Sequence, residues 1–264
     1  DFLVSPSARV FHYGQAIFEG MKCFRSDNDS LILFRPEENF KRFNKSSSRM
    51  AIPEISENIF FDGLTELLKI DKDWVKKGDG NALYLRPFVF ASEASINASE
   101  ANEYTFMIIC CPAKSYYGNQ KIKVKIEEKY SRAAKGGVGY AKAAGNYAAQ
   151  FYPTSIAIEE GYQQIIWTDS NNHKSIEEGI TRKSIIELAK KENIEVEERI
   201  ITVDELLESS KTGELKEIFG TGTAVVVLPI KAFGYQSNDY ELPQDDDSWS
   251  SMLKKKLMDI QYDK

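Results

Sequence analysis

The 264-residue sequence predicts a mixed α/β protein of the α+β class, built from two domains. Segments rich in β-branched and aromatic residues alternate with amphipathic segments, and the strand-like runs outnumber those of a simple βαβ series. The pattern breaks at PAKSYYGNQ, over residues 112–120. We therefore expect a small N-terminal α/β domain over residues 1–119 and a larger C-terminal domain over residues 120–264.

Local patterns predict the elements of the first domain. Residues 21–35 (MKCFRSDNDSLILFR) hold two apolar runs around a polar turn, as in a β-hairpin. Residues 36–52 begin with proline and two acidic residues, which is typical of a helix start, and carry Phe40 and Phe43 on one face. A second amphipathic helix is expected over residues 58–75. The predicted strands lie at residues 81–92 and 103–112.

The second domain again alternates strands and helices. Its predicted strands are residues 121–128, 163–169 and 196–203, and a helix is expected over residues 181–192. Thr202 and Glu205 have the spacing of a capping box ahead of a helical segment at 204–210. Residues 216–230 close this part as glycine-punctuated strand.

Composition and cysteine usage argue against several classes of function. The net charge of −6 disfavours general nucleic-acid binding, and no apolar run approaches the roughly 18 residues of a membrane span. The cysteines Cys23, Cys110 and Cys111 show neither a disulfide framework nor metal-ligand spacing, and His12 and His173 are too few for a multi-histidine site. We expect no nucleic-acid or membrane partner and no metal, and the cysteine usage makes a reducing cytoplasm the expected location.

One lysine stands out because it is the only charged residue in GGVGYAKAAGNYAAQ, residues 136–150. An isolated lysine in such a segment is most often solvated. A phosphate loop is rejected because Lys142 is not followed by Ser or Thr, and no buried strand precedes GGVGYA as in a dinucleotide site. The remaining hypothesis is a Schiff-base lysine, whose amine must be partly desolvated and needs space for a flat ring.

Five motifs in order now carry a resemblance: FHYGQAIFEGMKCF (11–24), YLRPFVFAS (84–92), GGVGYAKAAGNYAAQ, EEG with ITRKSIIELAK (177–190), and IFGTGTA (218–224). Over essentially its whole length the sequence resembles the branched-chain amino acid aminotransferases, enzymes of the two-domain D-amino-acid-aminotransferase-like fold. The resemblance implies pyridoxal 5'-phosphate as cofactor and a homodimer. It also implies ping-pong transamination of leucine, isoleucine and valine with 2-oxoglutarate, which gives branched-chain 2-oxo acids and glutamate.

The resemblance assigns cofactor contacts residue by residue. Lys142, placed in the C-terminal domain, would hold the cofactor and then move a proton between substrate and cofactor. Tyr147 would hydrogen-bond the phenolate oxygen of the cofactor. Glu178 would face the pyridine nitrogen, with neighbouring Glu177 as the alternative. The cofactor phosphate would be bound by Arg42, Thr223 and the backbone amides of Ile180 and Thr181.

The resemblance also assigns a substrate pocket. Aromatic walls suit a branched aliphatic side chain. Arg86 or Tyr13 would bind the second carboxylate of glutamate. Without the motifs, Phe18 and Tyr84 would be assigned to core packing. The lining residues implied by the family are Tyr13, Phe18, Tyr84, Arg86 and Ala224.

One stretch departs from the family. Relatives carry roughly thirty more residues between the positions of Glu178 and Gly179, enough for a few strands. Either the protein contains residues that this sequence omits, which the intact flanking motifs favour, or the chain lacks them. A true loss would put the carboxylate assignment and catalysis in doubt. The alternatives are a D-amino acid transaminase or aminodeoxychorismate lyase, which the motifs at 11–24 and 84–92 disfavour, and a catalytically inactive relative.

Overall fold

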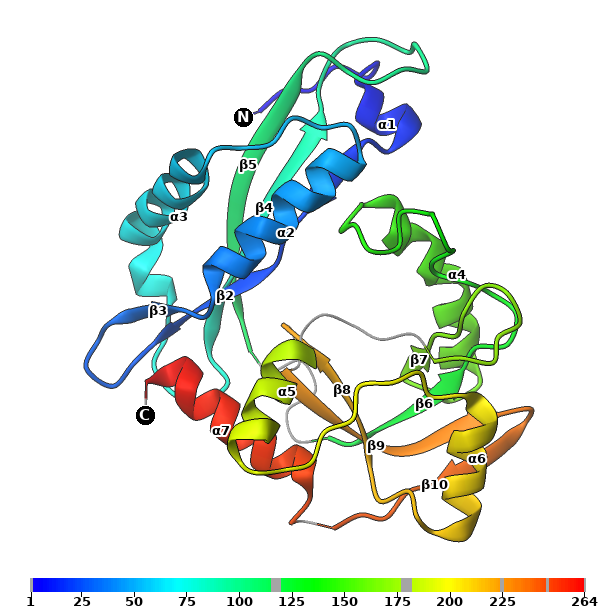
Figure 1. Ribbon diagram of the computed structural model, residues 1–264. Coiled ribbons are helices and arrows are strands. Elements are labelled where there is room, and N and C mark those ends of the chain that lie inside the picture. The colour runs from blue at the N-terminus through cyan, green and yellow to red at the C-terminus, as the bar shows by residue number, and fades with distance from the viewer. Residues whose placement is uncertain (1, 115–119, 177–181, 224–225, 246, 264) are drawn as a thin grey trace. The chain divides into compact units, whose positions relative to one another are not determined.

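The computed structural model describes residues 2–114, 120–176, 182–223, 226–245 and 247–263 (Figure 1). The chain forms two compact units, Asp1–Lys114 with Gly136–Ala149, and Ser115–Lys135 with Gln150–Lys264. This division differs from the predicted one at residues 136–149, which hold Lys142 and pack with the N-terminal residues. The physical reason is backbone pairing, because Ala143 forms an antiparallel bridge with Ile17.

The first unit contains a five-stranded antiparallel sheet centred on β4 (Ala82–Ala91). β5 (Tyr104–Ala113) pairs with β4 along one edge. β1 (Ala16–Phe18) and β2 (Met21–Arg25) share the other edge, and β3 (Leu31–Leu33) extends the sheet beyond β2. The β-hairpin expected over residues 21–35 and both expected strands are therefore confirmed.

Helices pack on one face of this sheet (Figure 1). The two predicted helices are confirmed as α2 (Pro36–Arg49) and α3 (Glu57–Asp71), and α1 (Arg9–Tyr13) precedes β1. A 3-10 turn, Lys72–Trp74, follows α3. The helices bury aromatic side chains against the sheet, and the core cluster includes Phe43, Phe60, Leu64, Leu83 and Leu85.

Alternation along β4 gives its two faces different roles. Leu83, Leu85 and Val89 belong to the buried core beneath the helices. Successive side chains of a strand point to opposite faces, so Tyr84 and Arg86 project from the other side of the sheet. The strand that builds the core therefore also presents two of the predicted substrate-binding residues.

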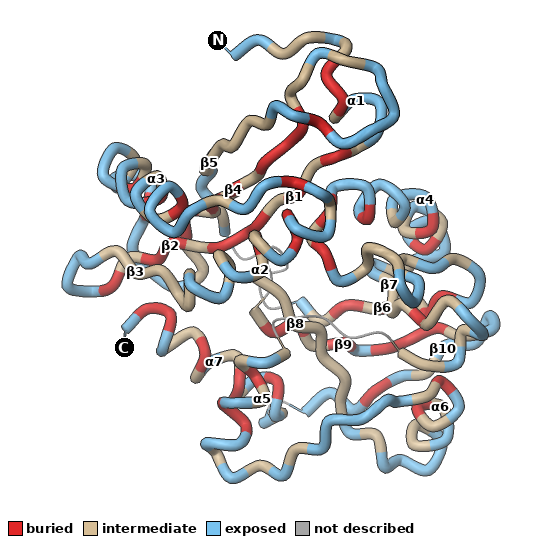
Figure 2. The backbone as a smooth tube through the Cα atoms, turned by 45° about the horizontal axis from the view of Figure 1, so that its top comes forward, coloured by how far each residue is buried: buried red, intermediate tan, exposed pale blue. Residues whose placement is uncertain are grey.

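The second unit contains another five-stranded sheet, in the order β10-β9-β6-β7, with β8 also paired to β9. β6 runs parallel to β7 and β9, whereas β8 and β10 are antiparallel to β9. Buried residues are concentrated on β6 and β9 (Figure 2). The strands are β6 (Ile122–Ile126), β7 (Gln164–Ile166), β8 (Ile218–Gly222), β9 (Val226–Tyr235) and β10 (Asn238–Glu241).

Four helices accompany this sheet in sequence. α5 (Arg182–Lys191) and α6 (Val203–Thr212) match predicted helices, whereas α4 (Gly145–Glu159) and α7 (Trp249–Tyr262) were not expected. α4 is obscured in the sequence because it starts in a glycine-rich stretch and contains Pro153. No helix within the described ranges is both long and apolar enough to cross a bilayer.

The predicted strand at residues 196–203 is wrong. Ile200 is 72% exposed, and within the described ranges no named strand pairs with this segment. Thr202 makes only an isolated bridge with Ser175 and acts as the N-cap of α6, accepting a hydrogen bond from Glu205 N at 3.2 Å. The Glu205 side chain pairs with Arg199. Capping and the lack of a sheet neighbour outweigh the β-branched composition here.

Candidate functional site

The backbone around Lys142 is held by contacts with β1 and α2. Lys142 N donates to Ser46 Oγ at 3.0 Å, and its carbonyl accepts a hydrogen bond from Phe18 N at 3.1 Å. The next residue, Ala143, bridges Ile17. These contacts anchor the main chain at residue 142 and do not involve the lysine side chain.

The Lys142 amine lies against two aromatic rings. Nζ donates a hydrogen bond to the Tyr147 hydroxyl at 2.8 Å. It also lies 4.5 Å from the centroid of the Phe18 ring and 5.1 Å from that of Tyr147, within the range of cation–π attraction. Tyr147 remains 37% exposed, so a ligand can reach this end of the pair.

Small residues beside the lysine leave open space, as the sequence predicts. A side chain at Gly145, the first residue of α4, would meet no heavy atom within 4 Å. Ala144 is exposed, whereas Asn146 is buried. The Asn146 amide donates to the carbonyl oxygens of Val138 at 2.8 Å and Ala141 at 2.9 Å, which closes the loop around the lysine. The open side of this loop is therefore the side of Ala144 and Gly145.

Arg42 projects from α2 toward Glu19, which directly follows β1. Arg42 Nη2 donates to Glu19 Oε2 at 2.7 Å, and Arg42 Nε donates to Oε1. Burial opposes the charge of the guanidinium, but the hydrogen bond and the negative charge of Glu19 outweigh it and raise the pKa of Arg42. Arg42 is also linked to the lysine, since Ser46 Oγ donates to Arg42 O at 2.8 Å and accepts from Lys142 N. The predicted phosphate ligand thus already has one anionic partner.

Glu19 is the main contact that sequence reasoning missed. Its side chain is fully buried, and Oε2 also accepts hydrogen bonds from Asn39 Nδ2 at 2.8 Å and Gly20 N at 3.1 Å. The one available signal was that Glu19 is the only acid in the apolar stretch AIFEGMKCF. Buried carboxylates require partners, so an acid in such a stretch predicts a nearby cation.

The predicted substrate residues Phe18, Tyr84 and Arg86 lie together. Arg86 Nη2 donates to the Tyr84 hydroxyl at 2.9 Å, and the guanidinium carbon lies 4.4 Å from the Phe18 ring centroid. Arg86 Nε is buried and has no hydrogen-bond partner in the described part of the chain. Because Phe18 also contacts the Lys142 amine, one ring connects the lysine with Arg86.

Glycine is required at position 20 by a close approach. A Cβ on Gly20 would lie 2.1 Å from the Tyr84 hydroxyl and 2.9 Å from Cζ of the same ring. Any larger residue would force a shift of the Tyr84 side chain, whose hydroxyl contacts Arg86. Three consecutive residues therefore have distinct roles: Phe18 supplies an aromatic ring, Glu19 is a buried acid, and Gly20 leaves space for the Tyr84 side chain.

Two other predicted site residues are also described. The Tyr13 hydroxyl donates to Ile96 O, and Thr223 follows β8 in the second unit. Predicted residues outside the described ranges are Glu177, Glu178, Ile180, Thr181 and Ala224. Those that the structure brings together are Phe18, Arg42, Tyr84, Arg86, Lys142 and Tyr147.

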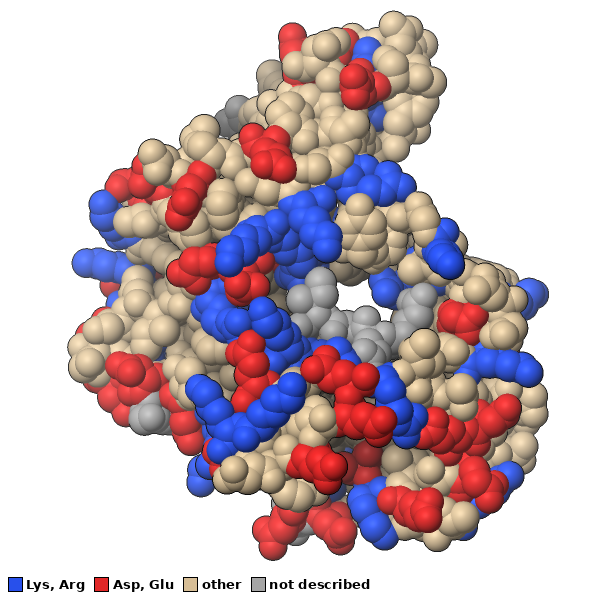
Figure 3. Space-filling model, viewed as in Figure 1, with Lys and Arg blue, Asp and Glu red and all other residues tan. Residues whose placement is uncertain are grey.

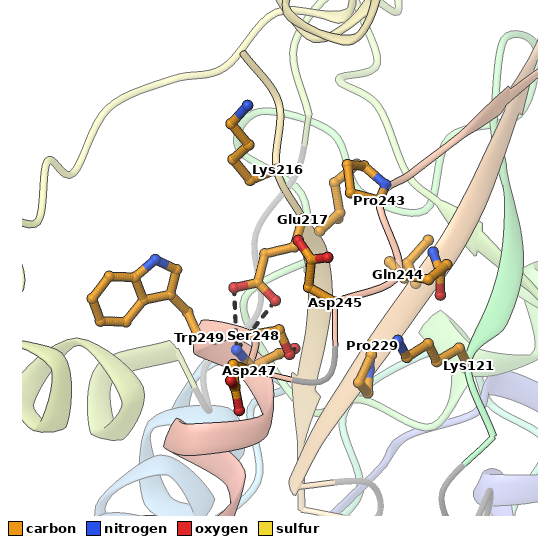
Figure 4. A pocket seen from close by; sticks show the side chains of 13 residues that line it. Lys121, Lys216, Glu217, Pro229, Pro243, Gln244, Asp245, Asp247, Ser248 and Trp249 are labelled. Atoms are coloured by element: carbon orange, nitrogen blue, oxygen red, sulfur yellow. Dashed lines mark hydrogen bonds between the residues drawn. The ribbon is translucent and has the colours of Figure 1, made fainter. Parts of the chain in front are cut away.

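A pocket of about 210 Å³ lies in the second unit (Figure 4). Both carboxylate oxygens of Glu217 accept hydrogen bonds from Ser250 N at 3.2 Å, which ties the start of β8 to the N-terminus of α7. None of the described site residues lines this pocket. The described ranges also contain no group of three or more His, Cys, Asp or Glu side chains suited to a metal ion.

Comparison with known proteins identifies the family. A model of class IV amino-transferases matches residues 172–233. Branched-chain-amino-acid transaminase 1 of Bacillus subtilis (strain 168) is 43% identical over 255 residues, which cover 86% of this chain and 72% of the relative. A "probable branched-chain-amino-acid aminotransferase" of Staphylococcus aureus (strain N315) is 40% identical and covers 97% of this chain and 78% of its own. The chain belongs to the branched-chain amino acid aminotransferase family. The predicted resemblance is confirmed.

A solved structure of this family shares the fold. The branched-chain amino acid aminotransferase of Thermobaculum terrenum, solved in its PLP-bound holo-form, matches with a TM-score of 0.77 and 17% sequence identity. The match covers 99% of this chain and 89% of the other. The predicted α+β fold of these aminotransferases is therefore confirmed.

The alignment with one relative includes residues that have no counterpart in this sequence. The alignment with the Staphylococcus aureus protein spans 285 positions, more than the 264 residues of this chain, so the relative carries residues without a counterpart here. Glu178 and Gly179 are consecutive in this sequence, which does not include the additional residues expected between them.

Proposed function

We propose that this chain is a pyridoxal phosphate-dependent transaminase that exchanges amino groups between leucine, isoleucine or valine and 2-oxoglutarate. The observation that carries the proposal is the Lys142 amine, 2.8 Å from the Tyr147 hydroxyl and beside open space at Gly145, in a chain of this family. The Thermobaculum terrenum aminotransferase, whose fold this chain shares, was solved with pyridoxal phosphate bound.

The residues present fit this cofactor. Bound pyridoxal phosphate supplies an aldehyde that reacts with amines and a ring that withdraws electrons from the substrate. Lys142 would provide the amine, the Tyr147 hydroxyl would orient the ring oxygen, and the guanidinium edge of Arg42 not used by Glu19 would bind the phosphate. We retain for Glu178, Ile180, Thr181, Thr223 and Ala224 the roles that the family resemblance implies.

The same cluster supports an amino acid substrate. The Lys142 amine would carry the proton at the substrate α-carbon. Phe18 and Tyr84 offer aromatic surface for a branched aliphatic side chain, with Tyr13 as a further lining residue. The buried Nε of Arg86, which has no hydrogen-bond partner among the described residues, would donate to the second carboxylate of glutamate.

Borohydride trapping tests the proposal directly. Borohydride reduces the carbon–nitrogen double bond between cofactor aldehyde and lysine to a stable secondary amine, which peptide mass mapping locates. We expect the pyridoxyl group on Lys142. Lys45 is the matched control, because its amine also lies over an aromatic ring, 5.1 Å from the Tyr140 centroid, and should stay unlabelled. A folded chain labelled at other lysines, or at none, contradicts the transaminase assignment.

In this sequence Glu178 is followed directly by Gly179, without the additional residues that relatives carry at this point. This difference favours one second candidate, a relative that binds the cofactor without turning over substrate. A substrate panel separates the candidates. Formation of glutamate from L-leucine and 2-oxoglutarate supports the transaminase, whereas labelled Lys142 without turnover supports the inactive relative. Turnover of D-alanine or of aminodeoxychorismate alone would assign the chain to one of the other enzymes with this fold.

We further propose that the protein is a cytoplasmic homodimer. Three free cysteines suit a reducing compartment, which cell fractionation would test. α4 exposes a strongly apolar surface, with Phe151 70%, Tyr152 64% and Ile158 58% exposed, that a second copy would cover. Light scattering should give about twice the chain mass of 30.0 kDa, and Phe151→Asp should lower it to one chain. A wild-type mass of one chain at micromolar concentration contradicts the dimer.

A further inference from the structure

The most completely buried acid of the first unit is Glu19, whose side chain has no exposed surface. Four donors converge on its carboxylate: Nε and Nη2 of Arg42, Nδ2 of Asn39 and the backbone N–H of Gly20. A buried carboxylate is costly unless it is paired and hydrogen-bonded. This set satisfies the charge and leaves Glu19 a single orientation.

The contact with Glu19 occupies only one edge of the Arg42 guanidinium. Glu19 uses the edge formed by Nε and Nη2. The other edge, formed by Nη1 and the second N–H of Nη2, can grip two oxygens of another anion in the same bidentate manner. The Arg42 side chain is 18% exposed and is therefore partly open to solvent.

The surroundings of Arg42 suit an anion. Lys and Arg side chains gather over α2 (Figure 3), and this helix contributes Lys41, Arg42, Lys45 and Arg49. Ser46 ties the Arg42 carbonyl to the backbone of Lys142. A guanidinium held by Glu19 would therefore have a set position relative to the cofactor lysine.

We propose that Glu19 is a positioning residue, which holds Arg42 so that its outer edge meets the phosphate of the cofactor; this rests on the function proposed above. Arginine has many rotamers, and binding an anion with a free arginine costs the freedom that it loses. Glu19 removes that freedom before the phosphate arrives. Its negative charge opposes the phosphate, so the proposal requires the gain in orientation to exceed this repulsion.

Glu19→Gln separates these two effects. Glutamine removes the charge, which by itself would strengthen phosphate binding. Its amide group, however, turns one of the two contacts with the Arg42 fork into a clash between two donors. We expect affinity for pyridoxal phosphate to fall about tenfold, as for the loss of one charge-assisted hydrogen bond. Affinity for pyridoxal, which lacks the phosphate, should stay within about twofold of wild type.

The readout is the dissociation constant of pyridoxal divided by that of pyridoxal phosphate. Both constants are measured by absorbance titration without substrate. Glu93→Gln is the matched control, because Glu93 pairs with buried Arg9 at 3.0 Å in the same unit, away from Lys142 contacts. This control should lower stability and leave the ratio unchanged. If Glu19→Gln does not fold, Asn39→Ala, which removes one donor to Glu19 at 2.8 Å, should lower the ratio by a smaller factor.

Two results overturn the proposal while the proposed function stands. One is a wild-type ratio in Glu19→Gln or, where that variant fails, in Asn39→Ala. The other is an equal fall of the ratio in the Glu93→Gln control. A wild-type protein that binds neither compound on Lys142 overturns the proposed function and this inference together.

Discussion

Replacing Lys142 with alanine is expected to lower kcat for transamination between L-leucine and 2-oxoglutarate by about 10⁴-fold. In the function proposed above, the variant would lose both the amine that holds the cofactor and the base that moves the substrate proton. No other described amine lies against the Phe18 and Tyr147 rings. The measurement is the steady-state rate at saturating pyridoxal phosphate, followed as glutamate formation.

Folding should be nearly unaffected by this change. The anchoring contacts of residue 142 with Ser46 and Phe18 are made by its backbone, which alanine retains. The free energy of unfolding should change by about 1 kcal/mol or less. Lys69→Ala is the control and should keep wild-type kcat, because Lys69 is an exposed residue of α3 that pairs with Glu66. Retention of more than about 1% of wild-type kcat in Lys142→Ala would show that another group moves the proton.

Replacing Phe43 with alanine is expected to destabilise the protein by about 3–5 kcal/mol. Phe43 is 0% exposed, and its ring centroid lies 5.6 Å from those of both Phe60 and Phe106. Truncation removes these contacts and leaves a cavity between α2 and the sheet. Urea unfolding followed by circular dichroism measures the change.

Exposure predicts a different result for a control phenylalanine. Phe11 is 64% exposed, so Phe11→Ala should alter stability by no more than about 0.5 kcal/mol. A cost below about 1 kcal/mol for Phe43→Ala would mean that neighbouring rings refill the cavity. Because Arg42 and Ser46 lie on the same helix as Phe43, we also expect weaker cofactor binding in the folded variant.

Strong local patterns made many elements predictable. The helices α2 and α3, the hairpin of β2 and β3, and the long strands β4 and β5 follow from periodicity, an initial proline and β-branched composition. The motif around Lys142 and Tyr147 indicated the candidate chemistry for a similar reason. The lysine, the tyrosine and the small residues between them lie in one short segment. The motif can therefore be recognised without knowing which distant residues pack against it.

Segments without a decisive local pattern were predicted less well. α4 lacks a clear apolar stripe, contains Pro153 and exposes Phe151 and Ile158, so its sequence does not display the periodicity of a buried helix. Residues 196–203 have the composition of a strand, yet no strand of the described chain lies beside them to complete a ladder.

The family, most elements of the first unit and the candidate lysine could all be inferred from sequence motifs and periodicity. The contact of Glu19 with Arg42, and the position of Phe18 between Lys142 and Arg86, became visible only in the folded chain. The paired residues are 23 positions apart for Glu19 and Arg42, and 96 apart for Ser46 and Lys142. Burial and charge pairing at such separations depend on which strands and helices pack together, and no local pattern records that choice.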